Sequence, residues 1–279
     1  MTIHEAARLG AQTLAAVPDP QLDAEWLLGE ALGMKRLELR LNATRSLTAE
    51  QETKYRDLLK KRAARVPLQY ILGTQSFFGC ELRVTEAVLI PRQETETLCE
   101  RALMALEATP SPAIADLCTG SGAIAIALRH ARPDARVWAT ELSPPALALA
   151  RENAQKNGTV ITFLEGDLLE PLQGLTFDCI VSNPPYISTG ALAALQPEVR
   201  FEPRMALDGG TDGLLFYRRL AQGVPTVLRP GGRVFLELGD GQADAVAALF
   251  AAAGFAEIRV HNDLFGCPRV LEARRQDGR

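Results

Sequence analysis

Residues 113–131 read AIADLCTGSGAIAIALRHA, and this stretch decides the fold. The short apolar run 113–117 predicts a buried strand, and the apolar residues 123–131 predict a helix. The glycine-rich turn between them lets the backbone come close to a ligand, and the following helix presents free N–H groups. A strand, a tight turn and a helix in this order predict a βα unit that binds a ligand at the carboxyl end of its strand.

The chain downstream repeats this alternation of strand and helix. Strands are expected at residues 136–140, 160–165, 178–182 and 233–238, and helices at residues 143–158, 218–228 and 242–253. Two last strands, 258–262 and 270–274, are expected as an antiparallel pair. Strands separated by helices predict an α/β fold with a parallel, doubly wound sheet, which we place at residues 91–279.

The chain upstream has a different character. Residues 1–73 show helical periodicity without strand-like alternation, and Thr2 with Glu5 and Thr48 with Gln51 have the spacing of capping boxes. We therefore predict a small N-terminal helical domain at 1–73. Residues 74–90, TQSFFGCELRVTEAVLI, predict a β-hairpin linker broken at Gly79.

Composition excludes several classes of protein. The chain has 279 residues, 47% of them hydrophobic and 23% charged, which suits a two-domain globular protein. It has no apolar run long enough to cross a membrane and no secretory leader, so we expect a cytoplasmic protein without membrane contact. Its five cysteines are widely spaced, which argues against disulfides and a zinc site.

Charge bears on the partners of the protein. The net charge of −4 argues against sequence-specific nucleic-acid binding through many phosphates. Residues 54–65 nevertheless form a basic run, with Lys54, Arg56, Lys60, Lys61, Arg62 and Arg65 opposed by Asp57. This run is either a solvated helix face or a docking face for an acidic or RNA-bound partner.

An acidic residue completes the predicted ligand loop. Glu141 ends the next strand about 20 residues after Gly122, where a carboxylate accepts hydrogen bonds from the hydroxyls of a ribose. The segment from Gly120 to Ala125 also fits G-x-G-x-x-A, a pattern of dinucleotide-binding proteins. The loop alone therefore leaves both S-adenosylmethionine and NAD open. It lacks the lysine of a P-loop NTPase.

The tetrapeptide Asn183-Pro184-Pro185-Tyr186 follows the strand at 178–182. Its prolines fix the backbone where the strand ends. The side-chain oxygen of Asn183 and the carbonyl of Pro184 can accept two hydrogen bonds from one planar NH2 group, and Tyr186 can pack on the attached π-system. At this place in a nucleoside-binding sheet, the tetrapeptide favours an amino-group methyltransferase over a dehydrogenase.

These motifs together resemble the bacterial peptide chain release factor N5-glutamine methyltransferases of the PrmC/HemK type. The resemblance covers nearly the whole chain and rests on PLQYILG (67–73), LIPRQETE (89–96), DLCTGSG (116–122), NPPY (183–186) and EPRMAL (202–207). The chain departs from the family pattern at three positions. Cys118 stands where glycine is usual and should fit with a negative φ, Glu141 replaces aspartate, and Gln93 replaces proline.

The resemblance implies a class I, Rossmann-like, seven-stranded S-adenosylmethionine-dependent methyltransferase domain. The enzyme would methylate the side-chain nitrogen of the glutamine in the GGQ motif of class 1 release factors and leave S-adenosyl-L-homocysteine. The implied cofactor contacts are Cys118, Thr119, Gly120, Ser121, Gly122, Glu141, Asp167, Leu168 and Asn183. The implied catalytic residues are Asn183, Pro184 and Tyr186, and Asn183, Pro184, Pro185 and Tyr186 would bind the substrate.

Other functions stay open beside this one. An adenine or guanine amino-methyltransferase of nucleic acid would use the same tetrapeptide, a nicotinamide-dependent oxidoreductase would use the same loop, and a non-enzymatic binding module could retain the fold. We expect a monomer whose helical domain docks the release factor, because one glutamine side chain offers too little surface for selection. The segment from Phe201 to Pro203 is a lid, a substrate wall or a packing loop.

Overall fold

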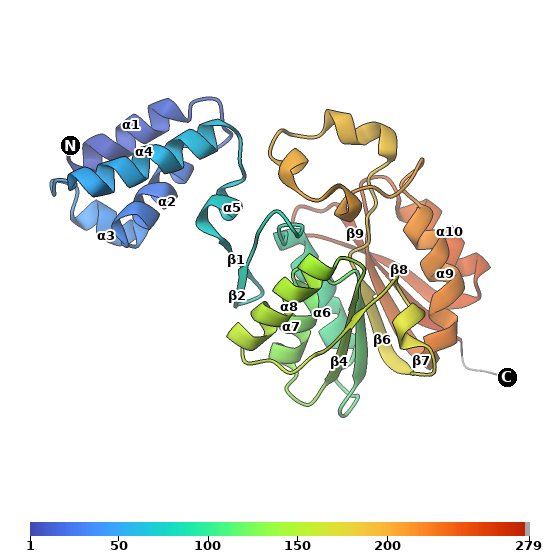
Figure 1. Cartoon of the computed structure of the whole chain (residues 1–279). Coiled ribbons are helices and arrows are strands. Elements are labelled where there is room, and N and C mark those ends of the chain that lie inside the picture. The colour runs from blue at the N-terminus through green and yellow to red at the C-terminus, as the bar shows by residue number, and fades with distance from the viewer. Residues whose placement is uncertain (277–279) are drawn as a thin grey trace. The chain divides into compact units, whose positions relative to one another are not determined.

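The computed structural model describes residues 1–276, and contacts divide this chain into two compact units (Figure 1). The first unit holds Met1–Thr74 together with Gln196–Phe201, a short segment from much later in the sequence. The second holds Gln75–Leu195 and the chain from Glu202 onward. Within residues 1–276, every helix is too short or too polar to span a bilayer.

The first unit is helical, as predicted. Its core contains the fully buried Tyr55, whose hydroxyl donates to the carbonyls of Ala6 and Ala24 at 3.3 Å and so joins three helices. Both predicted capping boxes are present, at Thr2 and at Thr48. The helices are α1 (Ile3–Thr13), α2 (Pro20–Leu32), α3 (Arg36–Leu41), α4 (Ala49–Ala63) and α5 (Leu68–Leu72).

The basic run in and after α4 is largely paired with acids. Arg62 is buried, with its Nε atom 2.6 Å from Asp23 Oδ2 and its Nη1 atom 2.9 Å from Glu198 Oε1. Arg65 binds the other oxygen of Glu198 at 2.7 Å. Burial alone would raise the pKa of Glu198, but the two arginines outweigh it and lower the pKa to about 2. The prediction of an exposed basic run is therefore wrong for Arg62.

The hairpin predicted at 74–90 is present as β1 (Thr74–Phe77) and β2 (Cys80–Arg83). Phe78 and Gly79 form its turn, with φ angles of 48° and 77°. Two left-handed residues are what a tight two-residue hairpin turn needs. The buried Asn153 holds the second strand, because its Oδ1 atom accepts a hydrogen bond from the Arg83 amide at 2.7 Å.

The second unit is built on one sheet, which within residues 1–276 has seven strands in the order β5-β4-β3-β6-β7-β9-β8. The strands from β5 to β7 pair in parallel, and β9 runs antiparallel to both of its neighbours. The predicted doubly wound sheet with an antiparallel end is confirmed. The bounds are β3 (Ala113–Leu117), β4 (Arg136–Glu141), β5 (Thr162–Glu165), β6 (Phe177–Ser182), β7 (Leu228–Glu237), β8 (Phe255–Asn262) and β9 (Pro268–Arg275).

Helices cover both faces of this sheet (Figure 1). The helices α6 (Glu96–Ala105), α7 (Ala123–Ala131) and α8 (Pro144–Lys156) pack on one face, whose core includes Ile114. The helices α9 (Leu215–Val227) and α10 (Ala243–Ala252) pack on the other, whose core includes Ala113 and Ala115. Burial of both faces explains why β3 is apolar at every position except Asp116 and does not alternate with polar residues.

The start of β7 differs from the prediction. The strand was expected at 233–238, but β7 already begins at Leu228, directly after α9, so the segment Pro230-Gly231-Gly232 lies inside the strand. Phe177 pairs with Leu228 whereas Cys179 pairs with Arg233, so β7 bulges between these pairs. A glycine with a φ of 76° at position 231 accommodates the bulge.

The loop between β3 and α7 follows left-handed backbone. The φ angle is 57° at Cys118, so the expected negative φ at this position is wrong. A left-handed conformation costs a residue with a side chain roughly 1–2 kcal/mol. Gly122 has a φ of 82°, and a Cβ atom there would lie only 3.1 Å from Ile126 Cδ1 and 3.2 Å from Ala150 Cβ. Glycine at 122 therefore lets α7 and α8 approach closely.

The strain at Cys118 can be measured with two variants that both remove the sulfur. Cys118→Gly should be more stable than Cys118→Ala by roughly 1 kcal/mol, because glycine adopts a left-handed backbone without the steric penalty that alanine has there. This penalty exceeds the larger conformational entropy that glycine loses on folding. Urea unfolding followed by circular dichroism gives the free energy of unfolding of each variant. An alanine variant as stable as the glycine variant would contradict strain at this position.

Candidate active site

The parallel register brings three strand ends to one edge of the sheet. Leu117, the last residue of β3, pairs with Thr140 of β4 and with Ser182 of β6. The residues that end or follow these strands therefore share this edge. Ligands of doubly wound sheets bind in the crevice outside such carboxyl ends.

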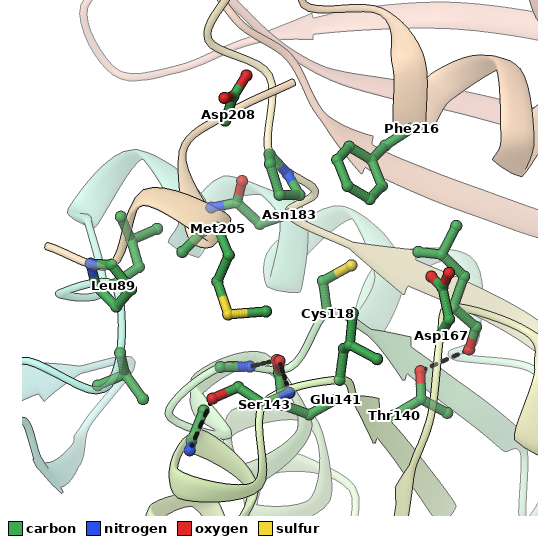
Figure 2. A pocket seen from close by; sticks show the side chains of 18 of the residues that line it. Leu89, Cys118, Thr140, Glu141, Ser143, Asp167, Asn183, Met205, Asp208 and Phe216 are labelled. Carbon is green, nitrogen blue, oxygen red and sulfur yellow. Dashed lines mark hydrogen bonds between the residues drawn. The ribbon is translucent and has the colours of Figure 1, made fainter. Parts of the chain in front are cut away.

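A cavity of about 430 Å³ lies at this edge, which is a usual size for a small-molecule site. Cys118, Glu141 and Asn183 line it, each from a different strand end. In the view of Figure 2, Glu141 and Asn183 lie on opposite sides of the cavity, and the side chain of Met205 extends between them. Sequence reasoning predicted that these three strand ends would form one site, and the structure places them together.

Glu141 connects the glycine-rich loop to the start of α8. Its Oε2 atom accepts a hydrogen bond from the Gly120 amide at 2.9 Å, and its Oε1 atom accepts one from the Ser143 amide at 2.9 Å. An ionised carboxylate can accept about four hydrogen bonds. About two acceptor positions therefore remain on a carboxylate that lines the cavity, which is what a pair of ribose hydroxyls requires.

The other predicted loop residues shape the loop from behind the cavity. The hydroxyl of Thr119 donates to Asp116 Oδ2 at 2.5 Å, and the Ser121 carbonyl accepts from Asn153 Nδ2 at 2.9 Å. Burial raises the pKa of Asp116 to about 7, against the opposing hydrogen bonds from Thr119 and the Ala125 amide. Cys118 and Gly120 line the cavity, whereas Thr119, Ser121 and Gly122 do not.

Asp167 and Leu168 also line the cavity, beyond the end of β5. The Oδ2 atom of Asp167 accepts a hydrogen bond from Arg219 at 2.8 Å, and the guanidinium of Arg219 lies 5.9 Å from the centre of the Phe216 ring. Leu168 and Phe216 give this part of the cavity apolar walls. An apolar wall beside a carboxylate suits a flat base that carries an amino group.

Asn183 reaches the cavity from the end of β6, and Pro185 lines it as well. The Nδ2 atom of Asn183 lies 3.4 Å from Thr95 Oγ1. Among residues 1–276, no group donates a hydrogen bond to the Oδ1 atom of Asn183 or to the carbonyl of Pro184. Two acceptors on adjoining residues are therefore unused, and of these two residues Asn183 lines the cavity whereas Pro184 does not.

Tyr186 lies outside the lining of the cavity. Its hydroxyl donates to Glu237 Oε1 at 3.3 Å, and its carbonyl accepts a hydrogen bond from Gln242 Nε2 at 3.0 Å. Burial raises the pKa of Tyr186, so its hydroxyl stays protonated as a donor. These contacts fix the end of the tetrapeptide, and the role of Tyr186 beside a bound amide stays a prediction.

The segment after the tetrapeptide returns to the cavity at Pro203 and Met205, which both line it. Glu202 anchors this return, because it forms an ion pair with Arg92 and its Oε2 atom accepts from the Ile90 amide at 3.0 Å. Burial raises the pKa of Glu202, and the positive charge of Arg92 opposes that rise. Pro203 lines the cavity while Glu202 packs behind it, and a role of this segment toward a substrate stays a prediction.

Sequence reasoning missed several residues of the cavity. Leu142 and Phe216 line it, and Leu142 is 53% exposed directly after Glu141. A large apolar residue next to the predicted acid was a usable signal for Leu142. No local pattern marks Phe216, which starts α9 far along the chain. Thr95 was read only as part of the LIPRQETE segment, without a role.

Comparisons with known proteins identify the family of the chain. Residues 5–73 match the family model of the PrmC N-terminal domain, and residues 97–199 match that of the methyltransferase small domain. The release factor glutamine methyltransferase of Geobacter sulfurreducens is 48% identical over 259 residues, which cover 92% of this chain and 90% of that protein. The enzyme of that name from Moorella thermoacetica is 45% identical over 282 residues, which cover 99% and 100%.

A solved structure adds evidence on the fold. The 16S rRNA N2 methyltransferase of Thermus thermophilus, in complex with AdoMet and guanosine, matches with a TM-score of 0.51 and 22% identity over 73% of this chain and 50% of that one. The methyltransferase fold and the family resemblance drawn from the motifs are both confirmed. The chain belongs to the family of release factor glutamine methyltransferases.

Proposed function

We propose that this chain transfers a methyl group from S-adenosyl-L-methionine to the side-chain nitrogen of the glutamine in the GGQ motif of class 1 release factors. The observation that carries the proposal is the unused acceptor Oδ1 of Asn183 at a cavity shared with Glu141, with the unused carbonyl of the adjoining Pro184 next to it in the chain. The names of the relatives from Geobacter sulfurreducens and Moorella thermoacetica support a release factor as the substrate.

Asn183 and Pro184 suit a primary amide in particular. An amide NH2 group has two hydrogens and a nitrogen lone pair that is conjugated with its carbonyl, so it is a poor nucleophile in solution. Two acceptors hold both hydrogens and fix the direction of the nitrogen, which is catalysis by orientation. The prolines at 184 and 185 keep the acceptors in place. The nitrogen can lose its proton after attack, so the site needs no titrating base.

The residues of the cavity fit S-adenosyl-L-methionine, which would supply a methyl group activated on a sulfonium. Glu141 has acceptor positions for the ribose hydroxyls, and Leu168 with Phe216 offers apolar walls for the adenine. A Cβ atom at Gly120 would have no neighbour within 4 Å, so the backbone of the loop is open on that side. We propose that these residues hold the cofactor.

The role of Glu141 can be tested by calorimetry. Glu141→Ala should weaken S-adenosyl-L-methionine binding by roughly 1.5–3 kcal/mol, the usual contribution of hydrogen bonds to a charged group. Glu165→Ala is a matched control, because Glu165 pairs with Glu141 in the sheet but is exposed and does not line the cavity. Equal affinities of the two variants would remove Glu141 from the proposed cofactor site.

The reaction itself can be tested with labelled S-adenosyl-L-methionine and purified class 1 release factors. The full-length chain should label the GGQ glutamine, as peptide mapping would show. Asn183→Ala should lower kcat roughly 10²–10³-fold, by analogy with the loss of one preorganised polar partner, and should bind the cofactor almost normally. Label on nucleic acid instead of the release factor, in a parallel incubation, would favour the alternative amino-methyltransferase.

We infer further that the helical unit docks the release factor. Selection of one protein needs an interface of roughly 1,200–2,000 Å², far more than one glutamine supplies. The helical unit exposes apolar side chains, since Trp26 is 46%, Leu37 68% and Leu41 77% exposed. Lys61 lies in α4 of the same unit and is exposed, in contrast to the buried Arg62.

Charge reversal at Lys61 tests this docking role. Lys61→Glu should raise the KM for intact release factor roughly 2–5-fold at low salt, as expected for one exposed charge, with kcat unchanged. The effect should fade as salt screens the charge. Arg259→Glu makes the same change of net charge on an exposed residue of β8 and should leave the KM unchanged. Equal KM values for both variants would exclude Lys61 from the docking surface.

A further inference from the structure

The side-chain amide of Asn183 has two ends of opposite character. Its oxygen accepts hydrogen bonds, whereas its NH2 group only donates them. A substrate NH2 group can bind only the oxygen, so the amide must present Oδ1 to the cavity. A reversed amide would set two NH2 groups against each other. Something in the protein has to select the productive orientation, and the residues of the tetrapeptide themselves do not.

Thr95 touches the end of Asn183 that must stay away from the substrate. It lies at the end of the short 3₁₀ helix Gln93–Thr95 and is buried. Its Oγ1 atom is 3.4 Å from Asn183 Nδ2 and 2.5 Å from Glu237 Oε2. The long contact to Asn183 is of the kind that tightens in active sites when substrate binds.

Glu237 fixes the direction of both contacts. It is the last residue of β7 and only 2% exposed, and its Oε1 atom also accepts the hydroxyl of Tyr186 at 3.3 Å. An ionised carboxylate only accepts hydrogen bonds, so Thr95 must donate its single hydroxyl hydrogen to Glu237. Towards Asn183 the hydroxyl oxygen can then only accept. Asn183 must therefore direct Nδ2 to Thr95 and Oδ1 away from it.

We propose that Glu237 and Thr95 are positioning residues, which select the orientation of the Asn183 amide that accepts a hydrogen bond from the substrate NH2 group. The inference rests on the proposed function, because it assigns the substrate-facing end of Asn183. Glu237 also holds Tyr186, so one buried carboxylate anchors both ends of the tetrapeptide.

The surroundings of Glu237 support a negative charge at this buried place. Burial raises the pKa of the carboxyl, and Glu94 adds to that rise. The hydroxyls of Thr95 and Tyr186 and the guanidinium of Arg269 oppose it without cancelling it, so the pKa of Glu237 stays above its ordinary value. Glu237 thus has both donors and a positive charge around it, which is the condition under which a buried carboxylate is retained as an acceptor.

Two substitutions at Thr95 separate the hydroxyl from the shape of the side chain. In the full-length chain, Thr95→Val removes the hydroxyl with little change of volume and should lower kcat roughly 10–100-fold, the usual effect of losing a residue that orients a ligand-contacting side chain. Thr95→Ser keeps the hydroxyl and should stay within about 3-fold of the wild type by the same reasoning. Both variants should keep the wild-type affinity for S-adenosyl-L-methionine, because Thr95 does not line the cavity.

A double-mutant cycle distinguishes positioning from a general structural role. If Thr95 acts through Asn183, Thr95→Val should cause no further loss of kcat in the Asn183→Ala background. Losses that multiply would overturn the proposal. Glu237→Gln gives a second route if Thr95→Val folds poorly, because it places a donor in the carboxylate site. Since Glu237 also holds Tyr186, its effect on kcat should shrink in the Asn183→Ala background rather than vanish, and an undiminished effect there would overturn the proposal.

A measurement without substrate keeps this inference separate from the proposed function. The side-chain NH2 signals of Asn183 in an NMR spectrum can be identified by their loss in Asn183→Ala. They should shift in Thr95→Val and stay in place in Thr95→Ser. Unchanged signals in Thr95→Val would overturn the positioning role even for an active enzyme. A wild-type chain that fails to methylate release factors would instead overturn the proposed function. The NMR experiment would still test the orientation of the Asn183 amide, because it does not depend on activity.

Discussion

The parallel hydrogen bonding of β3 to β4 on one side and to β6 on the other is the constraint on which the site depends. The strands that follow β3 in the chain lie first on one side of it, as β4 and β5, and then on the other, as β6 and β7. A reversal of this kind leaves a crevice at the carboxyl edge of a doubly wound sheet. Glu141 and Asn183 belong to these flanking strands, so the sheet itself sets the distance between them. A slip of one residue would turn either side chain to the opposite face.

The octapeptide LIPRQETE at 89–96 links three segments around this edge. Arg92 forms an ion pair with Glu202 next to the cavity wall, and Thr95 binds Glu237 beneath the tetrapeptide. Glu96 accepts a hydrogen bond from the Phe78 amide in the hairpin turn at 2.7 Å. Charged or polar residues of one short piece of chain thus hold the hairpin, the wall and the tetrapeptide.

The sequence predicted most of the fold because the fold is built from local patterns. Strands buried on both faces appear as short apolar runs. The glycine-rich turn follows the first of these runs directly, and the acid at the end of the next strand lies about 20 residues further along the chain. Details that depend on backbone geometry were not accessible, such as the left-handed φ of Cys118 and the bulge before Arg233.

Contacts between distant residues were harder still to predict. Thr95 and Glu237 are 142 positions apart, and neither carries a local signal that would pair it with the other. The buried Arg62 binds Glu198, which lies 136 positions away. Nothing in the sequence around Glu198 indicates that it contacts the N-terminal helices. Long-range hydrogen bonds and ion pairs of this kind follow from the topology of the fold. Composition and periodicity show only that the polar and charged residues exist.

The segment Gln196–Phe201 makes the helical unit discontinuous in sequence. The chain passes from one unit to the other at Thr74, returns at Gln196 and leaves again after Phe201. A chimera that exchanged only residues 1–74 between relatives would therefore separate Arg62 and Arg65 from the Glu198 with which they have to match. A module that can be exchanged intact comprises residues 1–74 and 196–201 together, so the helices have to be exchanged along with a piece of the chain that lies between β6 and β7.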